Sequence, residues 1–120
     1  MNPRSTIVSI HPYFKVQAGK LSEAKALFPR FIAATAPDPA CLYYDFTVKD
    51  DVVFCREAYV SAEALLGHVE KVGVVLGEML AISEIMRLEV HGGAAELDKL
   101  RGPLAAMNPD FYVFEAGAAR

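Results

Sequence analysis

The sequence has few of the features that mark metal, cofactor or disulfide-bonded proteins. Its 120 residues include no tryptophan and only two cysteines, Cys41 and Cys55. These cysteines form no CxxC or Cys/His metal spacing, and they do not face each other in the strand register that the sequence predicts. There is no phosphate loop and no GxGxxG. We therefore expect no metal, no cofactor, and two free thiols in a reducing cytoplasm.

Long apolar runs and basic clusters are also missing. No run reaches the ~18 residues of a membrane span, and the first residues lack the hydrophobic region of a secretory signal. A net charge of −3 without a basic cluster argues against a nucleic-acid partner. By contrast, hydrophobic residues make up 53% of the chain. Because a single small domain buries a limited share of its surface, this excess predicts a homo-oligomer, most simply a two-fold dimer.

Residues 41–59 predict a β-hairpin. Aromatic and β-branched residues form two runs on either side of Asp50-Asp51. A two-residue turn there, or a loop from Lys49 to Val52, gives the same strand register. The expected cross-strand pairs on one face are Val48 with Val53, Phe46 with Cys55, Tyr44 with Glu57, and Leu42 with Tyr59. On the other face Asp45 lies opposite Arg56.

The remaining patterns predict helices and strands on both sides of the hairpin. Strands are expected at 6–16, 84–91 and 110–115, and helices at 19–35, 74–82 and 94–101, with another helix that begins at the cap Ser61. Gly73 marks either a break or a kink between two helical pieces. Pro29 predicts a kink or an early end of the first helix, and Pro12 predicts an irregular position in the first strand.

The order of these elements is β-α-β-β-α-β, which predicts an α+β ferredoxin-like sandwich with an antiparallel sheet. The chain forms one domain over 1–120, with a core at about 6–91 and a C-terminal extension at about 92–120. Helices cover one sheet face, while the other carries His11, Tyr13, Tyr43 and Phe54 and is expected to form the dimer contact. We expect the extra strand to extend a sheet edge, that of the partner in a homodimer.

A group of polar side chains lies on the helix-facing side of the predicted hairpin. A buried glutamate is costly unless it is paired, so Glu57 requires partners. One interpretation is a pocket in which a proton is moved and an aromatic ligand is bound. The alternative is that a tyrosine hydroxyl and backbone amides satisfy Glu57, while His68 packs at the helix surface. The predicted site consists of His68 and Glu57 as catalytic groups, Tyr44, Tyr59, Phe14 and Cys55 as substrate-binding groups, and no metal ligand.

The same region resembles the antibiotic biosynthesis monooxygenase (ABM) domain family of small dimeric α+β barrels. The resemblance covers roughly residues 6 to 90. It rests on Ala18-Gly19-Lys20, Cys41-Leu42, Tyr44, Glu57, Tyr59, Ser61, Glu63-Ala64-Leu65 and His68. Members of this family include oxygenases that need neither metal nor flavin. They deprotonate a phenol or quinol between sheet and helices and let the anion react with oxygen.

This chain departs from the family pattern at several positions. The usual tryptophan is Tyr59, and a second histidine five positions after His68 is replaced by Gly73. The residues that serve the haem-degrading branch fall at Pro12 and near Glu78, so haem degradation is not expected. The resemblance therefore implies a cofactor-independent monooxygenase acting on a small aromatic or quinol-like substrate. Alternatives are a non-catalytic ligand-binding dimeric barrel and an isomerase of the same fold.

Overall fold

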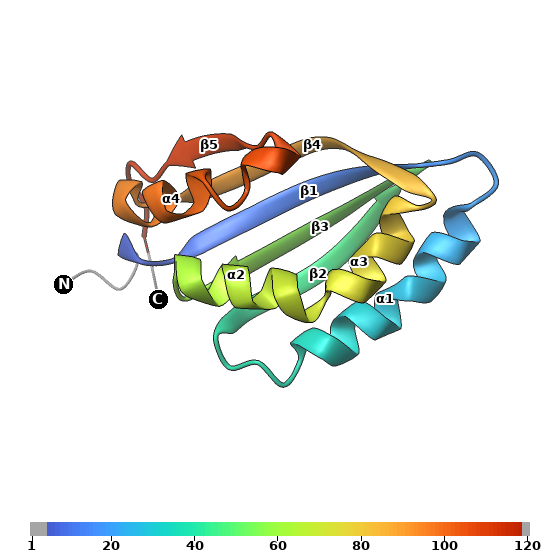
Figure 1. Ribbon diagram of the computed structural model, residues 1–120, viewed down its shortest axis with the longest axis horizontal. Helices are drawn as coiled ribbons and strands as arrows, with labels where there is room; N and C mark the ends of the chain where they lie inside the picture. The colour runs from blue at the N-terminus through green and yellow to red at the C-terminus, as the bar shows by residue number, and fades with distance from the viewer. Residues whose placement is uncertain (1–4, 119–120) are drawn as a thin grey trace.

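The computed structural model describes residues 5–118 as two layers, a twisted sheet with helices on one of its faces (Figure 1). The sheet has the order β2-β3-β1-β4-β5, in which neighbours are antiparallel except for the parallel pair β4 and β5. Its strands are β1 (Val8–Val16), β2 (Cys41–Lys49), β3 (Val52–Tyr59), β4 (Ser83–Gly92) and β5 (Asp110–Val113). The helices are α1 (Leu21–Thr35), α2 (Ala62–Lys71), α3 (Gly73–Leu80), α4 (Ala94–Arg101) and the 3₁₀ turn η2 (Ala105–Met107).

The predicted ferredoxin-like βαββαβ unit is confirmed, and the sheet as a whole is mixed. After β4, helix α4 returns the chain along the sheet, so that β5 runs beside β4 in the same direction. Backbone pairing joins Glu89 to Asp110 and Gly92 to Val113. The extra strand therefore extends the chain's own sheet. The expectation that it would join the edge of a partner's sheet is wrong, because the chain's own β4 offers the free edge.

The hairpin of β2 and β3 closes with the two-residue turn Asp50-Asp51, in which Asp50 has a left-handed φ of 52°. Three of the four predicted pairs, and the pair of Asp45 with Arg56, are confirmed. The fourth is wrong, because Tyr59 pairs with Cys41 instead of Leu42. A register shift between Cys41 and Tyr43 moves the strand by one residue, as a β-bulge does.

Two prolines are accommodated differently. Helix α1 continues through Pro29 to Thr35 and does not end early. Side-chain packing stabilises the helical turn that follows Pro29. Phe31 in this turn is 2% exposed, and its ring lies 5.4 Å from that of Phe46, between centroids. In β1, the pairing with β4 shifts directly after Tyr13, which confirms the irregularity expected near Pro12.

The second helix is broken rather than kinked. Val72 has φ −95° and ψ 6°, which separates α2 from α3 at Gly73. Ser61 caps α2 as predicted, since its hydroxyl oxygen accepts a hydrogen bond from the Ala64 amide. None of the helices within residues 5–118 combines the length and the hydrophobicity needed to cross a lipid bilayer.

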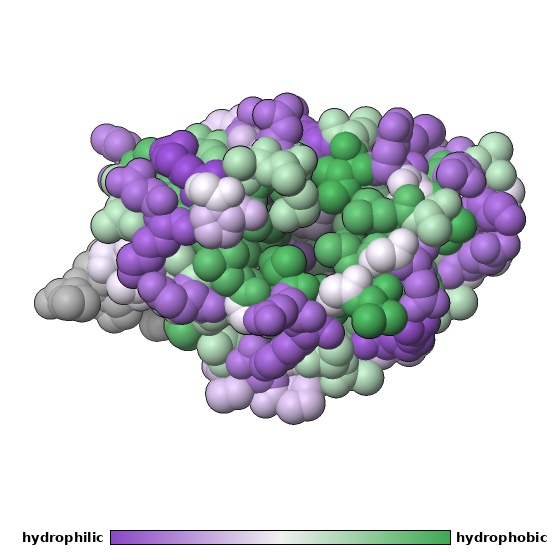
Figure 2. Space-filling view, in the orientation of Figure 1, coloured by the Kyte–Doolittle hydropathy of each residue, from purple (hydrophilic) through white to green (hydrophobic). Residues whose placement is uncertain are grey.

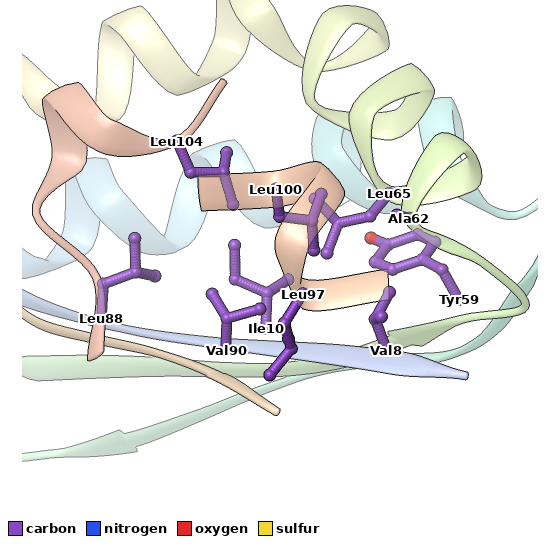
Figure 3. Close-up of a cluster of buried hydrophobic side chains, with 10 residues drawn as sticks. All are labelled: Val8, Ile10, Tyr59, Ala62, Leu65, Leu88, Val90, Leu97, Leu100 and Leu104. Atoms are coloured by element: carbon purple, nitrogen blue, oxygen red, sulfur yellow. The ribbon is translucent and has the colours of Figure 1, made fainter. Parts of the chain in front are cut away.

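The covered face of the sheet carries two hydrophobic clusters. One lies between the sheet, α2 and α4 (Figure 3). It contains Val8, Ile10, Tyr59, Ala62, Leu65, Leu88, Val90, Leu97, Leu100 and Leu104. The other lies under α1 and α3 and contains Phe14, Val16, Ala24, Phe31, Val53, Val72, Val75 and Met79. Residues of both clusters line one cavity, so the cavity lies where the two meet.

Candidate active site

The cavity has a volume of about 50 Å³ and lies between the sheet and helices α1, α2 and α3. Its walls are apolar over most of their extent, and the space-filling view shows a hollow surrounded by hydrophobic residues on the helix side (Figure 2). Such a volume has room for a few water molecules. Among the described residues that line it, nitrogen and oxygen side-chain atoms come from Tyr44, Glu57 and His68.

Glu57 of β3 is the buried carboxyl group of this cavity. It is paired across the sheet with Ile10 and Tyr44, and only 6% of its surface is exposed. The Tyr59 hydroxyl donates a hydrogen bond to Glu57 Oε1 at 2.5 Å. Burial raises the pKa of Glu57 to about 7, against the lowering effect of hydrogen bonds from Tyr59 and Cys55. Near neutral pH both the acid and the carboxylate are therefore populated.

His68 reaches Glu57 from helix α2. The capped start of α2 at Ser61 fixes the helix, so that two turns later the imidazole points at the sheet and is 2% exposed. Its Nε2 lies 3.4 Å from Glu57 Oε1. Burial lowers the pKa of His68 to about 4, so the ring is neutral above that pH. The contact therefore joins a neutral imidazole to a carboxyl group and is not an ion pair.

One atom of His68 is left without a partner. Among the buried side-chain nitrogen and oxygen atoms of residues 5–118, only His68 Nδ1 makes no hydrogen bond. A buried polar atom of this kind costs about 1–3 kcal/mol if nothing satisfies it. A ligand group that bonds to Nδ1 would recover this free energy.

The neighbouring hydroxyl and thiol groups hold their protons. Burial raises the pKa values of Tyr44, Tyr59 and Cys55, with the nearby Glu57 adding to the effect. The rings of Tyr44 and Tyr59 each lie 5.0 Å from that of His68. All three groups can therefore donate hydrogen bonds, and the thiol of Cys55 is unreactive.

The structure brings the six predicted site residues together. Five of them, Phe14, Tyr44, Cys55, Glu57 and His68, line the cavity. Tyr59 does not line the cavity. Its side chain is fully buried in the cluster between the sheet, α2 and α4, and its hydroxyl donates the hydrogen bond that orients the Glu57 carboxyl group. The expectation that His68 could pack at the helix surface is wrong.

Sequence reasoning missed part of the cavity wall. Val69 and Val72 lie at helical spacing after the cap Ser61, and this pattern indicates core residues rather than site residues. Met107 had no signal as a site residue. It lines the cavity because α4 and η2 fold back over the sheet, and no local pattern of residues predicts where such a segment returns. Residues 5–118 contain no group of three or more histidine, cysteine or acidic side chains that could hold a metal ion.

Comparison with solved structures places this chain in a family. MupZ from Pseudomonas fluorescens is 39% identical, with a TM-score of 0.91 over 96% of this chain and 95% of MupZ. The chain belongs to the MupZ family and has the ABM fold. A candidate antibiotic biosynthesis monooxygenase from Caulobacter crescentus CB15 is 22% identical, with a TM-score of 0.62 over 72% of this chain and 87% of that one.

More distant structures agree on the fold. A protein named as an antibiotic biosynthesis monooxygenase is 17% identical, with a TM-score of 0.60 over 69% of this chain and 92% of its own. Neither a family model nor a curated protein matches the sequence. The ABM fold predicted from residues 6 to 90 is confirmed.

Proposed function

We propose that this protein is an enzyme that moves a proton within the cavity, and that it acts as a cofactor-independent monooxygenase on a small aromatic or quinol-like substrate. The observation that carries the proposal is Glu57, a buried carboxyl group whose pKa is about 7, in contact with His68 and facing an apolar cavity. A general base works best when its pKa lies near the working pH. The names of distant ABM-fold relatives support the choice of reaction.

Each polar group has a role in this reaction. The substrate hydroxyl bonds to His68 Nδ1 or to Glu57, and Glu57 is the final proton acceptor. Loss of the proton makes the ring an electron-rich anion, which can reduce molecular oxygen. At a ring CH₂ group the overall reaction is CH₂ + O₂ → C=O + H₂O. Molecular oxygen is thus the only oxidant that the reaction needs. Tyr44 donates a hydrogen bond to the anion and so stabilises its charge.

A second candidate is an isomerase, and it is favoured by the same pKa. A carboxyl group that is half ionised near pH 7 can take a proton from one carbon atom and return it to another. Such a reaction needs no oxidant. It would release a product of the same mass as the substrate and consume no oxygen.

A thermal-shift screen against phenols, quinols, flavins and haem tests these functions, with dissolved oxygen recorded for every compound that raises the melting temperature. A phenol or quinol that stabilises the protein and consumes oxygen without added cofactor supports the monooxygenase. Conversion to an isomer without oxygen uptake supports the second candidate. Stabilisation without any conversion identifies a ligand-binding protein and contradicts both enzymatic proposals.

We further propose that two copies pack through the sheet face that the helices leave uncovered. This face carries ring contacts with centroid distances of 4.6 Å: the rings of Phe54 and Tyr13 are tilted to each other, and those of His91 and Tyr112 are stacked. Phe54→Glu would place a charge in the contact and is expected to give a monomer in analytical ultracentrifugation. Deletion of residues 108–120 separately tests whether β5 contributes. A Phe54→Glu variant that stays dimeric would contradict the proposed face.

A further inference from the structure

The cavity is too small for the ligand that the proposed function requires. Its volume is about 50 Å³, whereas a cavity that holds benzene measures about 150 Å³. Most of the wall belongs to the strands and to α1, α2 and α3. Most of those side chains are buried or pack against the buried residues of the two hydrophobic clusters. A part of the wall that is packed less tightly must therefore move before a ring can enter.

Met107 is the wall residue that is best placed to move. It is the only described residue of the wall that comes from the chain after β4. Leu104, three residues earlier, is 1% exposed and anchors the segment, whereas Met107 is half-buried. Asn108 then ends the 3₁₀ turn in a left-handed conformation, with φ 51°. An unbranched methionine side chain changes rotamer at little cost.

The chain at η2 lies beside the hollow on the helix side of the molecule. In the view of Figure 1, η2 lies on one side of the region over the central strands, and α2 and α3 lie on the other. Figure 2 shows the hollow between them, with hydrophobic residues around it. Met107 lines this cavity together with Val69 of α2 and Leu76 of α3.

We propose that Met107 is the specificity-determining residue of this cavity. Its side chain fills the entrance in the ligand-free protein, and its displacement provides the room for a ligand with one or two aromatic rings. The proposal rests on the cavity as the binding site in the proposed function, but not on the reaction. Met107 also lies outside the βαββαβ unit. The match to distant ABM-fold structures covers 69–72% of this chain, about the share that β1 to β4 make up. The match to MupZ covers 96% of the chain.

Titration calorimetry with phenol and 2-naphthol, carried out under nitrogen so that no oxygenation occurs, tests this role. The variants are Met107→Ala, Met107→Trp and the control Met86→Ala. Met86 is a β4 residue that is 57% exposed and does not line the cavity. Removing the Met107 side chain should improve binding of 2-naphthol relative to phenol by about tenfold or more, since even one methylene group in an apolar pocket has an effect of about this size. The tryptophan should weaken binding of both ligands by at least about tenfold.

The outcomes separate this proposal from the proposed reaction. Equal binding ratios in Met107→Ala and Met86→Ala would overturn it, as would undiminished binding by Met107→Trp in a protein that melts as the wild type does. Absence of binding in both the wild type and Met107→Ala would also overturn it. If the affinities change as expected but no ligand is oxidised or isomerised, the role of Met107 stands and the reaction is wrong.

Discussion

Two buried glutamates in this protein have the same exposure and opposite surroundings. Glu57 and Glu96 are each 6% exposed. Glu96 accepts hydrogen bonds from the Ala62 amide at 3.0 Å and from Lys99 Nζ at 2.9 Å. These contacts hold its pKa below the usual value. Glu57 has a tyrosine hydroxyl and a neutral imidazole as neighbours, and burial raises its pKa to about 7.

The difference separates a carboxylate that supports the fold from one that is available for chemistry. Glu96 joins α4 to the first turn of α2. The positive end of the α2 helix dipole also stabilises a negative charge there. The charge of Glu96 is compensated, and it does not line the cavity of Glu57. Glu57 lies on a cavity wall that includes no lysine or arginine, so its ionisation is costly and it is partly protonated near pH 7. Strongly shifted pKa values of this kind gather at functional sites.

The largest expected effect is on the rate. Glu57→Gln keeps the size of the side chain but cannot accept a proton, so we expect the turnover of any oxidised phenol or quinol to fall by about 100-fold or more. Glu96→Gln is the matched control and should retain a rate within about twofold, because it only weakens a contact remote from the cavity. Steady-state oxygen uptake measures both. Full activity of Glu57→Gln would remove Glu57 from the mechanism.

The next effect is on how stability depends on pH. The pKa of Glu57 is raised from 4.5 to about 7 in the folded protein. Its contribution to stability is therefore fully present below about pH 4.5 and is lost as the pH rises through about 7. Glu57→Gln has no such group. We expect its free energy of unfolding, relative to wild type, to rise by about 2–3 kcal/mol between pH 5 and pH 9.

Urea unfolding of the two proteins at both pH values measures this change. The cavity remains the same size, so other titrating groups cancel in the difference. If the free energies of unfolding of the variant and the wild type differ by the same amount at pH 5 and pH 9, Glu57 ionises as an ordinary surface carboxyl group does. That result would also weaken its assignment as a base near neutral pH.

The third expected effect is on the stability of the fold and concerns Glu96, the control residue of the first prediction. Glu96→Ala leaves the buried Ala62 amide without its acceptor, and we expect a loss of about 1–3 kcal/mol in the free energy of unfolding. The rate at 25 °C should stay near that of the wild type, since the cavity does not include Glu96. Thermal denaturation and oxygen uptake on one preparation test both statements. Lost activity in a folded Glu96→Ala protein would contradict the separation of the two roles.

The sequence predicts the frame of the site well. Glu57, Tyr44 and Cys55 were placed on one face because strand side chains alternate, and His68 was placed above them because a capped helix follows the hairpin. These are local patterns joined by one hairpin register. The error at Leu42 shows where such reasoning fails, because a bulge inserts one residue that no alternation pattern records.

Long-range features of the molecule were beyond the sequence. The pairing of β5 with β4 depends on how far α4 carries the chain back, and the place of Met107 depends on that same path. Glu96 was not recognised as a partner of α2, because Ala62 is 34 residues away. The pKa values of Glu57 and His68 follow from burial, which requires the packed structure.

The smallest expected effect tests the tyrosine behind Glu57. The Tyr59 hydroxyl donates to Glu57 Oε1 and so favours the carboxylate. Tyr59→Phe removes this bond, and the pKa of Glu57 should rise by about one unit, the equivalent of one hydrogen bond to a charged group. The alkaline shift should be visible in the pH dependence of kcat/KM and in the carboxyl ¹³C resonance of Glu57. Tyr13→Phe, on the opposite face of the sheet, is the control and should leave both unchanged. An unshifted midpoint in Tyr59→Phe would mean that burial and the Cys55 thiol set the pKa of Glu57, and that Tyr59 contributes only packing to the core.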